Sequence, residues 1–407
     1  MYADLAQLER ESLPSWETLL PENPLAGSGK LPIAHTVKSI IKQFCLLPEG
    51  EIAYDVVTAY FLIPSALAKV CPILFLQGRA GSGKSNLGFI ASQLYHVSIF
   101  SSSDTFASIR NELNKRKYIT IQVPKGEPYF GTDLKTVETN TFMVWDDIDA
   151  DIFSKQPDIY RMLKYGYDRS SDTITISSEK SGENLSFRCF CPKLVSSISP
   201  IHRFQARSEF ARRVLVIHTK RIQDFTPREL ENVSEMELKD KHDYSWQGFH
   251  ELIPSFWGDQ FRAVEYISTR VEVQKQLRKM KPEITPAQST ISVDLLTAGV
   301  IVGVWQSIPS AIAAMETYWT RAKAKETLAS EPIEQLLDEF LEREESAWQK
   351  AAQVCQSCLP LEIPLSLLRR KLNQWSEDLP ESVTLKAITP LMIERGYRLE
   401  PGKWILD

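Results

Sequence analysis

The sequence has no apolar run that approaches the ~20 residues of a membrane-spanning helix, and only six of its 407 residues are cysteines. So few cysteines suit a reducing compartment, in which disulfides are rare. The first residues, MYADLAQLERESL, are acidic and polar, which is not the pattern of a secretory signal peptide. We therefore expect a cytoplasmic protein that is not inserted in a membrane.

The chain also lacks an excess of positive charge. Its 47 Lys and Arg residues stand against 52 Asp and Glu residues, which gives a formal net charge of −5. Because no basic field covers the molecule, contact with a nucleic acid would need a local basic patch or a lined pore. Cys355 and Cys358 have the spacing of a zinc ligand pair, but no second Cys or His pair lies near them.

The hydrophobic pattern divides the chain into four segments. Residues 1–35 are proline-rich and predict an arm or linker, and residues 36–225 predict two helices followed by alternating strands and helices. Residues 226–330 are mostly helical, with many aromatic side chains that we expect in a core, and residues 331–407 begin with an acidic helix. The alternation predicts an α/β fold with a parallel sheet and helices on both faces.

The stretch ILFLQGRAGSGKSNLGFI, residues 73–90, has the pattern of a phosphate-binding loop. An apolar strand precedes G-x-x-x-x-G-K-S, and a helix follows it. In such a loop the backbone N–H groups surround phosphates, the lysine (Lys84) reaches the outer phosphates, and the hydroxyl (Ser85) binds magnesium. We predict that the segment binds ATP and Mg²⁺. The predicted nucleotide-binding residues are Gly78, Arg79, Ala80, Gly81, Ser82, Gly83, Lys84, Ser85 and Asn86.

A second GSGK at residues 27–30 does not fit the same pattern. Pro24 stands where the first glycine should be, Leu31 replaces the hydroxyl residue, and Pro32 follows at once. No apolar strand precedes this copy. We interpret it as a surface turn.

Adjacent carboxylates follow the next apolar strand, in TFMVWDDID at residues 141–149. Magnesium on a nucleotide takes oxygen ligands, usually through water, and a carboxylate at a strand end supplies one. A neighbouring carboxylate can orient the attacking water. We assign Asp146 to the metal and Asp147 to the water, with Asp149 as a weaker candidate for either role. The alternative is a strand that runs into an acidic turn.

Residues 173–178 and 185–189 alternate as two strands around a polar turn, which predicts a hairpin with Lys180 near its tip. The following apolar segment ends at Ser196 and Ser197. A polar side chain at the end of a strand beside the acidic strand can contact the γ-phosphate or the water. We favour Ser197 over Ser196 for this role.

Arg212 and Arg213 directly precede an apolar strand at residues 214–217. Arginine suits a transferring phosphate because it is planar, permanently charged and bidentate, and a neighbouring subunit can supply it. The pattern leaves open which of the two acts, with Arg207 as a third candidate. The alternative is a salt bridge at the start of the strand.

The last residues have the order helix, helix, hairpin: PLSLLRRKLNQW, then TLKAITPLMIERGY, then RLEPGKWIL. This is the outline of a winged-helix domain. The alternative is a generic α+β cap.

Taken in order, the phosphate loop, paired acids, hairpin, polar strand end and arginines resemble the AAA+ lineage of ATPases. Within it, residues 55–220 are similar to the superfamily-three helicases and the related helicase-like ATPases of phage and plasmid replication. The resemblance implies a homo-oligomeric ring that hydrolyses ATP and acts on DNA, with a helical lid after the motor. It also implies that Lys180 contacts DNA in the pore and that Arg212 and Arg213 lie in the arginine-finger region. The family's sensor is usually asparagine, whereas Ser196 and Ser197 stand there in this chain.

Two other functions fit part of the pattern. The acidic composition and the acidic helix at residues 331–345 suit an ATPase that remodels a protein partner, or a nucleotide switch, with the partner bound through the C-terminal region. A small-molecule kinase would explain the phosphate loop. It would explain neither the arginines nor the C-terminal third of the chain.

Overall fold

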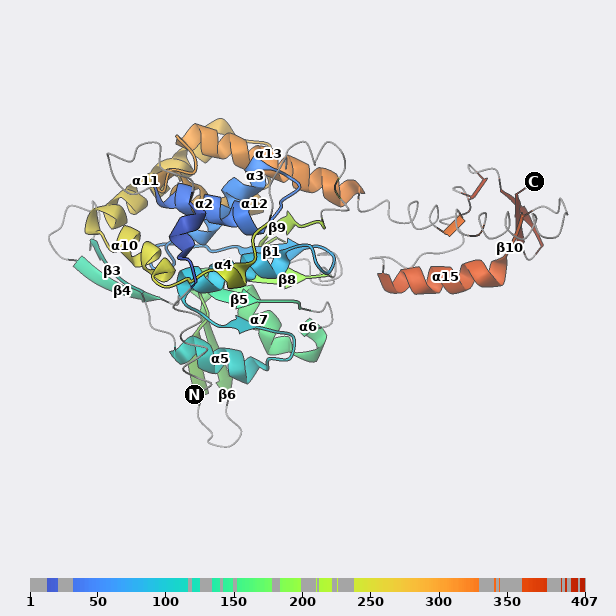
Figure 1. Ribbon diagram of the computed structural model, residues 1–407, viewed down its shortest axis with the longest axis horizontal. Helices are drawn as coiled ribbons and strands as arrows, with labels where there is room; N and C mark the ends of the chain where they lie inside the picture. The colour runs from blue at the N-terminus through green and yellow to red at the C-terminus, as the bar shows by residue number, and fades with distance from the viewer. Residues whose placement is uncertain are drawn as a thin grey trace. The chain divides into compact units, whose positions relative to one another are not determined.

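Five short apolar strands form a parallel sheet in the computed structural model of the chain (Figure 1). Their order across the sheet is β2-β5-β8-β1-β9. The strands are β1 (Ile73–Gln77), β2 (Ile99–Phe100), β5 (Met143–Trp145), β8 (Lys193–Ser197) and β9 (Val214–His218). Nearly every strand residue is buried, as expected for a parallel sheet that is covered on both faces. The predicted α/β fold with a parallel sheet is therefore confirmed.

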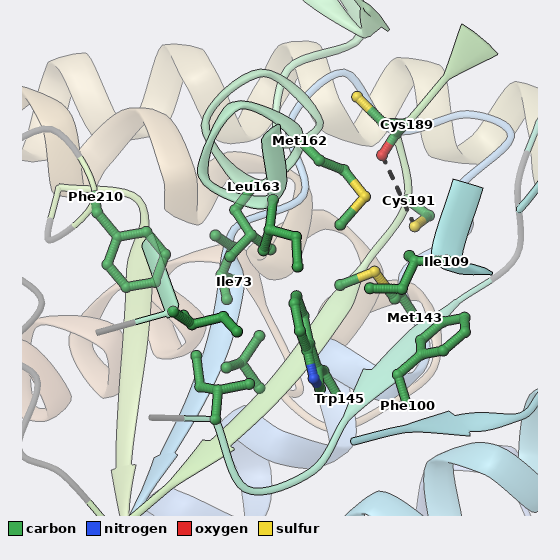
Figure 2. Packing of buried hydrophobic residues seen from close by; sticks show 14 of the residues in the cluster. Ile73, Phe100, Ile109, Met143, Trp145, Met162, Leu163, Cys189, Cys191 and Phe210 are labelled. Atoms are coloured by element: carbon green, nitrogen blue, oxygen red, sulfur yellow. Dashed lines mark hydrogen bonds between the residues drawn. The ribbon is translucent and has the colours of Figure 1, made fainter. Parts of the chain in front are cut away.

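One face of the sheet packs on a large apolar cluster (Figure 2). Ile73 and Phe75 of β1 point to this face together with Trp145 of β5 and Val195 of β8, because alternate residues of a strand point to opposite faces. The elements that cover this face are α5 (Phe106–Lys115), α6 (Ile152–Lys155), α7 (Pro157–Tyr165), β6 (Thr173–Ser177) and β7 (Asn184–Arg188). The antiparallel β6–β7 pair confirms the predicted hairpin.

The opposite face is covered by α4 (Lys84–Tyr95), α2 (Ile33–Phe44) and α3 (Glu51–Phe61). Gly88 of α4 lies so close to the sheet that a Cβ there would be 3.2 Å from Val144 Cγ1. The Tyr60 hydroxyl donates to Pro72 O at 2.6 Å and accepts from Lys193 N at 2.8 Å. Helix α3 is thus fixed to the amino ends of β1 and β8.

A helical region follows the sheet, as predicted, and packs on α3. Its helices are α10 (Leu252–Trp257), α11 (Gln260–Met280), α12 (Pro286–Ile301) and α13 (Ile308–Leu328). Trp257 Nε1 donates to Leu62 O at 3.1 Å, and the Tyr318 hydroxyl donates to Val216 O at 2.9 Å. The tryptophans at 257, 305 and 319 are buried, as expected, whereas Trp246 is half-buried between Phe44 and Phe89.

Shorter elements complete the first part of the chain. The antiparallel pair β3 (Ile119–Pro124) and β4 (Leu134–Thr139) is separate from the central sheet. The 3₁₀ turns are η1 (Trp16–Leu19), η2 (Arg169–Ser171), η5 (Lys241–Asp243) and η6 (Phe249–Glu251). Trp16 is buried against Phe249, and its Nε1 donates to Gln247 O at 3.1 Å. This part of the predicted N-terminal arm is therefore packed on the protein.

The chain divides into two compact units, Met1–Trp319 and Thr320–Asp407. In the second unit a small antiparallel sheet has the order β10-β12-β11. Its elements are β10 (Leu361–Pro364), α15 (Leu365–Asp378), β11 (Arg398–Glu400) and β12 (Lys403–Leu406). Ile363, Leu368 and Trp404 are buried in its core. The predicted strands at the C-terminus are confirmed, and β10 is an additional strand.

Among the helices within the described residues, none is both long and apolar enough to cross a membrane. The predicted second helix of the C-terminal domain and the acidic helix lie mostly outside these residues. The second GSGK, residues 27–30, also lies outside them. The structure describes residues 13–20, 32–115, 119–124, 134–139, 142–148, 152–177, 184–198, 210, 212–221, 225, 238–328, 340–341, 344, 361–378, 389, 392–393, 397–401 and 403–406.

Candidate functional site

The loop between β1 and α4 has the backbone geometry that its glycines predict. Gly81 and Gly83 have φ values of +77° and +86°, in the left-handed region that other residues avoid. At Gly78 the reason is space, because a Cβ there would lie 2.3 Å from Thr219 O. Gly83 is the N-cap of α4, so the loop ends at a helix N-terminus, where anions are favoured.

Lys84 is buried at the first turn of α4 and folds back over the loop. Its Nζ donates to Gly78 O at 2.6 Å and to Arg79 O at 3.0 Å. Burial lowers the pKa of Lys84 below its usual value, and the charges of Asp147 and Asp146 oppose that shift. The ammonium group and the two carboxylates therefore interact across the same site.

Asp146 and Asp147 follow β5 directly. Asp146 N donates to Phe100 O at 2.8 Å, and its carboxylate Oδ1 accepts from the Ser196 hydroxyl. Asp147 N donates to Ser196 Oγ at 2.8 Å. Asp147 has φ +55°, a left-handed conformation that Asp adopts more readily than most residues. The backbone turn after β5 thus holds the two acids in different orientations.

The neighbouring serines at the end of β8 point to opposite faces of the sheet. Met143 pairs with Lys193, and counting three residues along both chains places Ser196 beside Asp146. Ser197 is buried, and its Oγ donates to Ile148 O at 2.6 Å. The contact with the Asp146 carboxylate is therefore made by the Ser196 hydroxyl, whereas the sequence favoured Ser197 for a role at this strand end.

The sheet order explains why these groups meet. The connection from β1 leads to β2 at one edge, whereas the connection from its neighbour β8 leads to β9 at the other edge. Such a reversal opens a crevice at the carboxyl ends of the strands, where ligands bind in open α/β sheets.

A cavity of about 570 Å³ lies at this place, within the size range of small-molecule sites. It is lined by Phe44, Leu46, Ala80, Gly81, Ser82, Gly83, Lys84, Ser85, Asn86, Asp146, Asp147, Ile198, Lys220, Arg221 and Leu238. Most of the predicted loop residues and both predicted acids therefore share one cavity. The apolar wall and the two cations after β9 were not predicted from the sequence.

Arg212 and Arg213 lie at the opposite ends of the strands from the cavity. β9 runs parallel to β1, and Ile73 N donates to Arg213 O at 2.8 Å, so the arginines are at the amino ends of the strands. Five strand residues at ~3.3 Å each separate the amino ends of the strands from the loop between β1 and α4 by roughly 15 Å. The Arg213 guanidinium stacks 4.5 Å from the centre of the Tyr167 ring, whereas Arg212 is exposed.

Three predicted candidates, Lys180, Asp149 and Arg207, lie outside the described residues. Cys355 and Cys358 lie outside them as well. Within the described ranges no three His, Cys, Asp or Glu side chains gather as metal ligands.

No protein-family model matches this chain, and no curated protein matches it.

Proposed function

We propose that the cavity binds a nucleoside triphosphate with magnesium and that the chain hydrolyses it. The observation that carries this proposal is the placement of Lys84 and the loop 81–85 in one cavity with Asp146 and Asp147. A phosphate would replace the loop carbonyls that Lys84 Nζ contacts, and the loop glycines leave the backbone N–H groups accessible to it.

The residues present fit magnesium. Ser85 is exposed at the start of α4, and the Asp146 carboxylate lines the same cavity. These are hard oxygen donors, and Mg²⁺ bound to a nucleotide needs only one or two of them beside phosphates and water. Asp147 is placed to orient a water molecule for attack, and Ser196 holds both acids. When bound, the metal ion would neutralise charge on the phosphates.

We further propose that the chain works as a ring. Arg212 lies roughly 15 Å from the cavity of its own chain, so a role in hydrolysis requires the cavity of another copy. A head-to-tail arrangement that closes on itself would bring the amino edge of one sheet to the nucleotide of the next. The stacked Arg213 is better suited to supporting that edge, and Arg212 to reaching the neighbour.

DNA is the substrate that the resemblance to the superfamily-three helicases favours. The hairpin β6–β7 supports this proposal, as does the C-terminal unit, in which β10 leads into α15 and pairs with β12. Arg369 and Arg370 are exposed on α15, where they can contact phosphates as a winged helix would. The second candidate is an ATPase that remodels a protein partner or acts as a nucleotide switch.

One experiment tests these proposals together. The ATPase rate of the full chain is measured with no DNA, with single-stranded DNA and with duplex DNA, on material resolved by size exclusion with ATP. We expect an activity that DNA stimulates in an assembled fraction, and a Lys84→Ala variant that has lost it. An active protein that binds neither form of DNA would favour protein remodelling. A Lys84→Ala variant as active as the wild type would refute nucleotide hydrolysis at this loop.

A further inference from the structure

Three residues after β9 are attached to the phosphate loop. Thr219 N donates to Gln77 O at 2.8 Å, and the Thr219 hydroxyl lies 2.7 Å from the Ser82 hydroxyl. Thr219 also approaches Gly78 so closely that no side chain fits there. The segment after β9 is therefore held against the loop by these contacts.

This attachment places two cations in the cavity. Lys220 and Arg221 both line it, and both are partly buried. Arg221 Cδ lies 4.0 Å from the position that a Cβ on Gly81 would occupy. The arginine side chain thus lies against the middle of the loop, where both line the cavity.

The sheet order decides which end of a ligand these cations meet. β8 and β5, which carry Ser196, Asp146 and Asp147, lie on one side of β1, and β9 lies on the other. The carboxylates and the two cations therefore approach the loop from opposite sides. A nucleotide whose outer phosphate and metal lie by Asp146 points its nucleoside end toward Arg221.

We infer that Arg221, with Lys220 beside it, binds the α- and β-phosphates at the nucleoside end of the nucleotide and so sets its direction in the cavity. This inference rests on the proposed function of the same cavity. An arginine can hold two phosphate oxygens at once in a fixed plane. Partial burial strengthens such a contact, because the local dielectric is lower than in water.

The test measures equilibrium binding of Mg·ATP and Mg·ADP to the full chain. Arg221→Gln removes the charge, Arg221→Met keeps much of the length, and Arg221→Lys keeps the charge. The matched control is Arg262→Gln, because Arg262 is an arginine on α11 paired with Glu265 at 2.6 Å, away from the cavity. We expect Arg221→Gln and Arg221→Met to weaken both nucleotides by the same factor, roughly tenfold to a hundredfold. Arg221→Lys should recover part of the loss, and the control should bind as the wild type does.

Each outcome supports or overturns the inference. The melting temperature without nucleotide should be unchanged in Arg221→Gln; if this variant does not fold, Lys220→Gln carries the same expectation with a smaller effect. Wild-type affinity in a folded Arg221→Gln overturns the inference, as does a loss confined to ATP, since that would place the contact on the γ-phosphate. If the wild type binds neither nucleotide, or Lys84→Ala binds as well as the wild type, the proposed function fails and the inference fails with it.

Discussion

Ser196 and Ser197 are adjacent, chemically identical and equally buried, yet their hydroxyl groups have different partners. The Ser196 hydroxyl donates to the Asp146 carboxylate and accepts from Asp147 N. The Ser197 hydroxyl donates to a backbone carbonyl, that of Ile148. One serine therefore positions the acids, and the other stabilises the turn beneath them.

This difference gives a prediction for a matched pair of variants. We expect Ser196→Ala to lower the ATPase turnover by roughly tenfold to a hundredfold, because a hydrogen bond to a charged group contributes about 1.5–3 kcal/mol. We expect Ser197→Ala to lower the free energy of unfolding by about 1 kcal/mol, with a smaller effect on turnover. Steady-state kinetics and urea unfolding of both variants check this. Equal turnover in the two variants would contradict the assignment.

At this scale the sequence predicted the residues that belong to contiguous motifs. Lys84, Ser85, Asp146 and Asp147, which line the cavity, were chosen as candidates because strand, loop and helix follow each other along the chain. Arg221 and Phe44 were missed, since each reaches the cavity from another element through tertiary contacts. Their positions carried a weak signal, as Arg221 closely follows a buried strand.

Among the elements, the helical region is attached to the segment before β1 by a buried carboxylate, in addition to the contacts of Trp257 and Tyr318. Asp294 of α12 is fully buried and accepts from the Tyr266 hydroxyl at 2.8 Å and Arg270 Nε at 2.8 Å, both on α11. Its other oxygen accepts from Val70 N at 2.9 Å and Lys69 N at 3.2 Å. A single side chain thus connects two helices to the segment that leads into β1.

We expect Asp294→Ala to lower the free energy of unfolding by roughly 3–5 kcal/mol, because it leaves the buried part of Arg270 and two backbone N–H groups without their acceptor. Asp158→Ala is the control, since Asp158 pairs with Arg161 on the surface of α7, where such pairs contribute ~0–1 kcal/mol. Denaturant unfolding of both variants measures the difference. A similar loss of unfolding free energy in the two variants would show that the hydrogen bonds of Asp294 contribute no more than a surface ion pair.

Of the central strands, β1, β5, β8 and β9 could be predicted from the sequence because each is a short apolar run beside a turn, whereas β2 has only two residues and was not predicted. Their order could not, since it depends on pairings between residues far apart in the chain, such as Ile73 with Lys193 and Val214. β10 was missed for a different reason. It has only four residues, LEIP, and ends in a proline. An alternating pattern this short does not identify a strand when its partner β12 is unknown.

For the whole molecule, the placement of the arginines has the largest consequence. The cavity lies at the carboxyl ends of the strands and Arg212 at the amino ends of the same sheet. Under the proposed function, a nucleotide in the cavity of one copy would not reach Arg212 of the same copy. If Arg212 takes part in hydrolysis, activity is a property of the assembly and depends on protein concentration.

This dependence can be tested by mixing two inactive variants. Lys84→Ala chains keep Arg212 but lack the lysine of the loop, and Arg212→Gln chains keep that lysine but lack the arginine. In random mixed rings, about a quarter of the interfaces join an intact loop to an intact arginine. We expect each variant to be nearly inactive and the equal mixture to recover up to a similar fraction of the wild-type ATPase rate. The control variant Arg161→Gln changes a surface arginine of α7 and should be active without mixing. A mixture no more active than its components, in rings shown to exchange subunits, would exclude an arginine acting between copies.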